Sequence, residues 1–550
     1  GKYTEASILY RRAIQQDGRF GEAYYRLGLT HLKLNQPGQA VAAFRRAVEL
    51  QPNNPEAYQQ LIDLYLAAYM ANQEEQKPLL SELQALVAQL EQHVPNSVAV
   101  HRARGLLALS QQQYQAAIDE LTAAIQQQPD DAKAHLALAE ALARSGRWPE
   151  AEAQVRQFIQ RHPGEAAMYD FLYFYYVLHR QYKQAEAILQ QKCASNPKQL
   201  AYQMQLIHHY WATGSRDKAE AELNQLLNQH QEYPDVFEVA SNFYARLRLY
   251  DEALATLDRG IQAQPKSAPK LRRHKAQVLA MAGRTQEAEQ LLAQLLEEDP
   301  EDWGALAIRG ALRLKQPARQ DWSKAVAELE RAAAHLPDNP TVHHNLAEAY
   351  RLTGRPEDAI QEYQEVLRLA PGYLPARYGL ALAHMAKQDY ARVLAVTDEI
   401  LQTNPKDFRA SMIRAHAFLR SGDMAQATSI LEQVVKEHPE AKAPAYQLAI
   451  VRLQQRQFDE AEKLFRDLAE TPNPDPRSIL GLAEVAASRG QVDRALALLQ
   501  KQAEAQPENP VYRLALARQL ASLGRVKEAI REYEALLGQQ PNNAALHEEL

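Results

Sequence analysis

A small residue, nearly always alanine, recurs along the chain at a nearly constant interval, and this repetition constrains the fold more than any other feature. Most intervals are 34 residues, two are 35 and 37, and one gap of 77 separates Ala40 from Ala117. The recurring positions are Ala6, Ala40, Ala117, Ala151, Ala185, Ala219, Ala253, Ala288, Ala325, Ala359, Val393, Ala427, Ala461, Ala495 and Ala529. Such a period predicts an array of one small structural unit stacked on its neighbours.

The residues between these positions predict that each unit is a helix–turn–helix. A second small residue lies twelve positions earlier in many units, as at Gly105 and Ala139, and two small residues at this offset let two helices cross closely. Proline closes most units, as at Pro129 and Pro163, because it ends one helix and can open the next. Glycine recurs between the helices, as at Gly146, where a helix end needs a left-handed residue.

These residues resemble the tetratricopeptide repeat family over essentially the whole chain. The unit at 340–371 shows it clearly, with NLAEAY at 345–350, Gly354, and PEDAIQEYQEVLRLAP at 356–371. The resemblance implies an all-α, right-handed superhelix with the first helix of each unit lining a concave groove. We count fifteen complete units, with a lone second helix before them and the start of a first helix after them.

We expect residues 1–550 to form a single continuous solenoid without a separate globular domain. Two units depart from the pattern. The unit at 55–95 is about nine residues longer than the others and has a longer second helix around Lys77–His93. The unit at 303–337 has three extra residues, which predict an extended inter-helix turn near 316–321.

Composition excludes several classes of function. The chain has 62 basic and 68 acidic residues and a net charge of −6, without a long run of one sign, so a nucleic-acid partner is not expected. No stretch of about 18 apolar residues predicts a membrane span. The single cysteine, Cys193, rules out an internal disulfide framework and is compatible with either the cytoplasm or the bacterial periplasm and cell envelope.

No sequence motif predicts a catalytic centre, a metal site or a cofactor. Neighbouring histidines such as His208 and His209 face different sides of a helix and would chelate a metal poorly. Glycine-rich phosphate loops and nucleophile elbows are absent from the sequence. We therefore predict a protein that is not an enzyme, unless a catalytic domain lies outside this sequence.

By the family resemblance, the side chains that reach the groove occupy the second, fifth, ninth, twelfth and thirteenth positions of each first helix. The candidate ligand-binding residues are Asp170, Phe174, His208, Trp211, Asn242, Arg246, Arg273, Gln277, Arg351 and Tyr378, and further groove positions hold His344, His416 and Tyr446. A clamp for a terminal carboxylate would need lysine, arginine and asparagine in a different order from the one found here. An asparagine ladder is excluded, since only Asn345 agrees with it.

Aromatic residues are most concentrated at 168–182, 208–211 and 242–250. Among them, Phe174 and Trp211 lie at groove positions, whereas Tyr176 and Tyr210 lie at positions that face inward in the family. Aromatic and arginine side chains carry much of the binding energy at interfaces. We predict that Phe174 and Trp211 contact a ligand, either an extended peptide or a sugar ring, while Tyr176 and Tyr210 belong to the core.

The sequence therefore favours a protein-interaction scaffold that binds an extended peptide or a partner protein in its groove. The alternative is a structural component of the bacterial envelope, in contact with exopolysaccharide. Because both ends carry incomplete units, we expect the sequence to be a fragment of a longer array. If these were the natural ends, contacts between them could join chains end to end into filaments.

Overall fold

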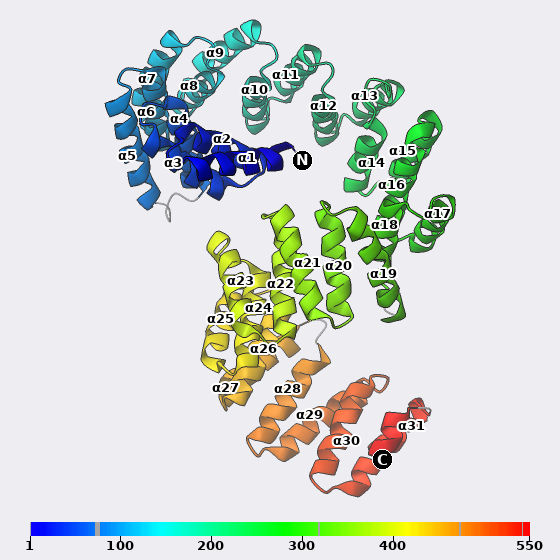
Figure 1. Ribbon diagram of the computed structural model, residues 1–550. Coiled ribbons are helices and arrows are strands. Elements are labelled where there is room, and N and C mark those ends of the chain that lie inside the picture. The colour runs from blue at the N-terminus through cyan, green and yellow to red at the C-terminus, as the bar shows by residue number, and fades with distance from the viewer. Residues whose placement is uncertain (1, 72–76, 317–318, 472–474, 542) are drawn as a thin grey trace. The chain divides into compact units, whose positions relative to one another are not determined.

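The computed structural model describes residues 2–71, 77–316, 319–471, 475–541 and 543–550. Helices account for 81% of the chain, and no strand occurs within the described ranges. The chain divides into two compact units, Gly1–Leu271 and Arg272–Leu550, which we call the N-terminal and C-terminal units. In both units, the helices form antiparallel hairpins that stack side by side (Figure 1). That the whole chain is one continuous solenoid stays a prediction.

The N-terminal unit begins with a single helix, which seven hairpins follow. Its elements are α1 Lys2–Gln16, α2 Gly21–Lys33, α3 Pro37–Leu50, α4 Pro55–Ala71, α5 Lys77–His93, α6 Val98–Ser110, α7 Tyr114–Gln127, α8 Ala132–Arg144, α9 Trp148–Arg161, α10 Ala166–Leu178, α11 Tyr182–Ser195, α12 Leu200–Ala212, α13 Arg216–Asn228, α14 Val236–Arg246, α15 Tyr250–Ala263 and the 3-10 helix η1 Pro265–Ser267. The even-numbered helices from α2 onward are the first helices of their hairpins.

The C-terminal unit contains most of α16, which spans Ala268–Met281 and so crosses the division, together with every later helix. These are α17 Thr285–Glu298, α18 Trp303–Arg313, α19 Arg319–His335, α20 Pro340–Leu352, α21 Pro356–Leu369, α22 Leu374–Ala386, α23 Tyr390–Thr403, α24 Phe408–Ser421, α25 Met424–Glu437, α26 Lys442–Gln454, α27 Phe458–Ala469, α28 Pro476–Ser488, α29 Val492–Ala505, α30 Pro510–Ser522, α31 Val526–Gln539 and α32 Ala544–Glu549. Over the described residues, α2–α31 make the fifteen predicted hairpins, and the all-α prediction is confirmed.

In the thirteen hairpins whose turns the structure describes in full, the turn repeats one backbone geometry. Seven glycines have φ between 73° and 88° at this turn, as predicted from their position. Six other hairpins adopt a positive φ at the same place without glycine, for example at Asn35 and Arg180. The backbone N–H of the residue after this position then donates a hydrogen bond to a carbonyl oxygen near the end of the first helix, as Arg355 N does to Tyr350 O at 2.8 Å. The turn geometry therefore does not depend on glycine.

Small residues permit the close helix crossings that the sequence predicts. Ala139 and Ala151 are fully buried in the N-terminal unit. In the C-terminal unit, a Cβ added to Gly379 would overlap the ring of Tyr363, which is itself fully buried. A large side chain on the second helix of one hairpin thus fills the space above a small residue on the first helix of the next, and this contact packs the two hairpins together.

The two irregular hairpins differ from the rest as their lengths suggest. Both helices of the hairpin α4–α5 have 17 residues, and α5 has the predicted bounds, while residues 72–76 lie outside the described residues. In the hairpin α18–α19, the expected turn near 316–321 is only partly a turn. Residues 319–321 belong to α19, which has 17 residues, and residues 317–318 lie outside the described part.

Candidate ligand-binding surface

The first helix α10 carries a pair of exposed apolar side chains on the face opposite to its core. Phe174 is 64% exposed and Leu178 is 79% exposed, and side chains four residues apart lie next to each other on a helix. The opposite face of α10 buries Met168, Leu172 and Tyr176. Leu178 was not among the predicted ligand residues, although its thirteenth position in the first helix is one of the groove positions.

Helix α12 places two further predicted residues beside α14. The ring of Trp211 is half-buried and stands edge-on to Phe243, with centroids 5.6 Å apart, and the guanidinium of Arg216 lies 4.9 Å from its centroid. The exposed His208 also meets Phe243 edge-on, at 4.9 Å. Partial desolvation of the His208 ring, and then the charge of Arg246, lower the pKa of this histidine below its usual value. Its ring is therefore neutral near pH 7 and can both donate and accept a hydrogen bond.

Helix α14 presents two polar side chains that are free to bind a ligand. Asn242 and Arg246 are exposed, and Arg246 forms no ion pair with any residue that the structure describes. Ring contacts join the three helices, because Tyr173 of α10 meets His209 of α12 at 5.6 Å, and Phe243 joins α12 to α14. We call the exposed side chains Phe174, Leu178, His208, Asn242 and Arg246, together with the half-buried Trp211, the α10–α14 surface.

Asp170 is different, because it is tied into the interior of the hairpin stack. Its Oδ1 accepts hydrogen bonds from Lys192 Nζ at 2.6 Å and from Gln205 Nε2 at 3.0 Å. Lys192 is 1% exposed and also lies 4.2 Å from the ring centroid of Tyr202. A buried ammonium needs such a partner, and removing it would leave an uncompensated charge. Asp170 therefore has a structural role in this fold, and we leave it out of the α10–α14 surface.

The predicted residues of the C-terminal unit are mostly engaged in structural contacts as well. Tyr378 is 8% exposed, and its hydroxyl donates to Asp407 Oδ2 at 2.7 Å, so its assignment to the groove is corrected to the core. Arg273 pairs with Asp302 at 2.7 Å. Arg351 donates to Glu348 at 2.7 Å. Only Gln277 among these four candidates is exposed.

The pairing of Glu348 shows how firmly these groups are held. Burial raises the pKa of this carboxyl, but hydrogen bonds from Arg351 and from the hydroxyl of Tyr363 more than offset burial and lower the pKa below its usual value. Burial of the Tyr363 ring and the nearby carboxylate of Glu348 raise the pKa of Tyr363. Charges that are satisfied inside the protein contribute little to binding a partner, because a ligand would have to break these bonds first.

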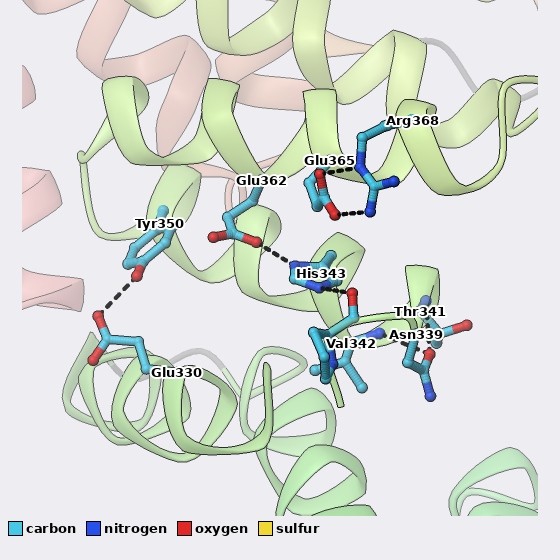
Figure 2. Close-up of polar contacts among 10 residues, drawn as sticks. Glu330, Asn339, Thr341, Val342, His343, Tyr350, Glu362, Glu365 and Arg368 are labelled. Carbon is cyan, nitrogen blue, oxygen red and sulfur yellow. Dashed lines mark hydrogen bonds and ion pairs between the residues drawn. The ribbon is translucent and has the colours of Figure 1, made fainter. Parts of the chain in front are cut away.

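Polar side chains also join neighbouring helices, both within a hairpin and between hairpins, as Figure 2 shows around α20 and α21. His343 lies between two acceptors: its Nδ1 is 2.6 Å from Glu362 Oε2, and its Nε2 is 3.0 Å from the carbonyl oxygen of Pro337. Tyr350 donates to Glu330 at 2.8 Å. His135 repeats the contact with a closing proline through Pro129 O at 3.0 Å. These histidines stabilise the junctions between hairpins and are not candidates for binding.

The remaining predictions concern groups that could support chemistry. No cluster of three or more histidine, cysteine, aspartate or glutamate residues suited to a metal occurs in the described ranges. Cys193 is buried, and burial raises the pKa of its thiol to about 11. Among the described helices, none is both long and apolar enough to cross a membrane. The absence of enzymatic activity stays a prediction.

Family models of the tetratricopeptide repeat match most of the chain. The matched residues are 21–54, 108–172, 176–243, 244–308, 318–373, 352–417 and 418–485. A model described as anaphase-promoting complex, cyclosome, subunit 3 matches residues 454–536. Comparison with curated proteins gives no significant match.

Solved helical proteins resemble the chain weakly. A tetratricopeptide repeat protein from Parabacteroides merdae is 16% identical, with a TM-score of 0.36 and coverage of 45% of this chain and 98% of that one. A chain of the Naa15/Naa10 complex bound to HypK-THB is 14% identical, with a TM-score of 0.33 and coverage of 99% of this chain and 92% of that one. A chain of the APC/C hetero-tetramer Cut9-Hcn1 is also 14% identical, with a TM-score of 0.36 and coverage of 91% of this chain and 96% of that one. These scores are too low to support an argument. The repeat matches alone cover more than half of the sequence, so the chain belongs to the tetratricopeptide repeat family, a family of protein-interaction scaffolds.

Proposed function

We propose that this scaffold binds an extended peptide segment of a partner protein along the α10–α14 surface. The observation that carries the proposal is the exposed pair Phe174 and Leu178 on a helix whose other face is fully packed. Scattered apolar side chains are common at protein surfaces, whereas adjacent exposed ones are typical of interaction sites, where aromatic and arginine side chains are enriched.

The polar groups of α12 and α14 suit the backbone of an extended peptide. The side-chain amide of Asn242 can donate to a peptide carbonyl and accept from a peptide N–H, and the neutral ring of His208 can do the same. Arg246 supplies a positive charge that no described residue neutralises. Such a surface combines apolar anchors with a few directional polar contacts, which gives both affinity and orientation.

Selection of peptides from a random display library against the intact chain tests the proposal. The affinity of a selected peptide is then measured by calorimetry for Phe174→Ala, Leu178→Asp and a control, Val526→Asp, which changes a side chain of α31 that is 57% exposed. A binding hot spot is worth about 2 kcal/mol or more, so we expect affinity to fall about thirtyfold in the first two variants. Equal affinity for all three variants would refute the assignment.

The other functions considered from the sequence have less support. Exopolysaccharide contact and end-to-end association of chains stay predictions, because no specific contact among the described residues favours them over a peptide. The absence of a catalytic role follows from the family only as a general tendency. The selection experiment discriminates among these functions, since a polysaccharide binder yields no peptide that depends on Phe174.

A further inference from the structure

A second surface lies in the C-terminal unit, on the first helices α22 and α24. It is a hollow of about 410 Å³. The lining residues are Leu382, Met385, Ala386, Gln388, Ile413, His416, Leu419 and Arg420. The lining follows the repeat, because Leu382 and His416 are 34 residues apart, and so are Met385 and Leu419.

The floor of this hollow is apolar and adaptable. Leu382, Met385 and Leu419 are half-buried, and Ile413 beneath them is 5% exposed. A methionine side chain is flexible and polarizable, so it can fit apolar groups of different shape. The volume lies within the range of roughly 300–1,000 Å³ that is usual for ligand sites. A large apolar side chain of a partner therefore fits the floor.

The rim of the hollow is positively charged and uncompensated. Arg420 is exposed and forms no ion pair with a described residue. His416 is held in place by a hydrogen bond with Gln447 of α26. None of the eight lining residues is acidic. The hollow lined by α3, α4 and α5 differs, because its arginine, Arg45, is already paired with Glu82.

We propose that this hollow binds an acidic peptide segment of a partner protein. One aliphatic side chain of the segment enters between α22 and α24, and a neighbouring carboxylate pairs with Arg420, whose guanidinium can hold a carboxylate through two hydrogen bonds. The charge of the rim selects for acidic and against basic segments. This site is formed by other helices than the α10–α14 surface, so either one can fail without the other.

The probe is a short fluorescein-labelled peptide with one leucine among aspartates and glutamates, added to the intact chain and followed by fluorescence anisotropy. Two analogues serve as references: one replaces the acidic residues by lysines, and the other replaces the leucine by glycine. We expect the acidic leucine peptide to bind at least about tenfold more tightly than either analogue, with affinity that decreases as salt increases.

Two variants with matched controls locate the binding. Arg420→Glu reverses the charge of the rim, and Ala386→Trp fills the hollow from an exposed position of α22. The controls are Arg531→Glu on α31 and Ala521→Trp on α30, which make the same changes at exposed positions elsewhere. We expect about tenfold weaker binding in the first pair and less than about twofold change in the controls.

A spectroscopic readout confirms the location. The chain has seven methionines, so the spectrum of protein labelled with ¹³C-methyl methionine contains few signals, and Met385→Leu assigns the signal of Met385. This signal shifts during titration with the acidic peptide if the peptide enters the hollow. The proposal is overturned if the acidic leucine peptide does not bind at about 1 mM, if the basic analogue binds equally well, or if Arg420→Glu and its control behave alike.

Discussion

Phe174 and Tyr176 test the division of α10 into a binding face and a core face. The two residues are about 200° apart around the helix, so their side chains point in nearly opposite directions. Phe174 is 64% exposed, whereas Tyr176 is 1% exposed and its hydroxyl donates to Glu152 at 2.5 Å and accepts from Arg156 at 2.8 Å. Burial and the Glu152 carboxylate raise the pKa of Tyr176 to about 12, so the hydroxyl keeps its proton.

The cost of each truncation follows from these contacts. Tyr176→Ala removes a fully buried ring and its edge-on contact with Trp148, which costs about 3–5 kcal/mol. Phe174→Ala removes a mostly exposed ring and changes stability by no more than about 0.5 kcal/mol. Because every 1.4 kcal/mol is tenfold in an equilibrium constant, local opening around α10 becomes roughly a hundredfold to a few thousandfold more frequent in Tyr176→Ala only.

Native-state hydrogen exchange measures this opening, because amide protection in α9–α11 reports the free energy of local unfolding in a stacked repeat. Peptide affinity measured on the same proteins gives the second half of the test. We expect Phe174→Ala to keep its amide protection and to lose affinity for a peptide of the α10–α14 surface. The binding face has been assigned wrongly if Phe174→Ala loses amide protection, or if it binds the peptide as tightly as the unchanged chain does.

Three further predictions concern stability and reactivity. Gly379→Ala should cost about 1–3 kcal/mol in urea unfolding, because the added Cβ overlaps the ring of Tyr363, while Gly372→Ala meets no atom within 4 Å and should be nearly neutral. Cys193, with its pKa raised to about 11, should react with Ellman's reagent far more slowly in the folded chain than in urea, and equal rates would contradict its burial. Burial lowers the pKa of His135, so below about pH 6.5 the unfolded chain binds the proton more readily than the folded one. Urea midpoints should therefore fall between pH 7 and pH 5, and they should fall less in His135→Gln.

The hairpins and their number could be predicted from the sequence because the repeat reports packing directly. Alanine recurs where two helices cross, with Val393 as the one larger residue, because these positions, which are buried from Ala40 onward, leave little room for a side chain, and so the period follows the helix contacts. The backbone conformation of the turns could be predicted from the sequence only in part. Arg180 and Gln388 adopt a positive φ where other hairpins use glycine, and arginine and glutamine are not residue types that predict a positive φ. The register of the repeat, which places them at the glycine position, is the signal that could have found them.

The candidate ligand residues were harder to predict, because a groove position does not tell whether a side chain is already engaged. The fifth position of the first helix shows why. In three hairpins, the side chain there reaches the aspartate that caps the next first helix, 29 residues later: Arg102 with Asp131, Arg273 with Asp302, and Tyr378 with Asp407.

Each of these aspartates accepts hydrogen bonds from two different elements. One carboxylate oxygen caps a helix by accepting a backbone N–H, as Asp407 Oδ1 does from Ala410 N at 2.8 Å, and the other accepts from the fifth position of the preceding first helix. A hydrogen-bond donor at the fifth position, followed by aspartate 29 residues later, is thus typical of the junction between two hairpins. The side chain at such a fifth position is already engaged, so it is not a candidate for binding a ligand. The ninth and thirteenth positions have no such partner in α10 and α14, where Phe174, Leu178, Asn242 and Arg246 stay exposed. Binding residues in this array are therefore those that the stacking of hairpins leaves unused.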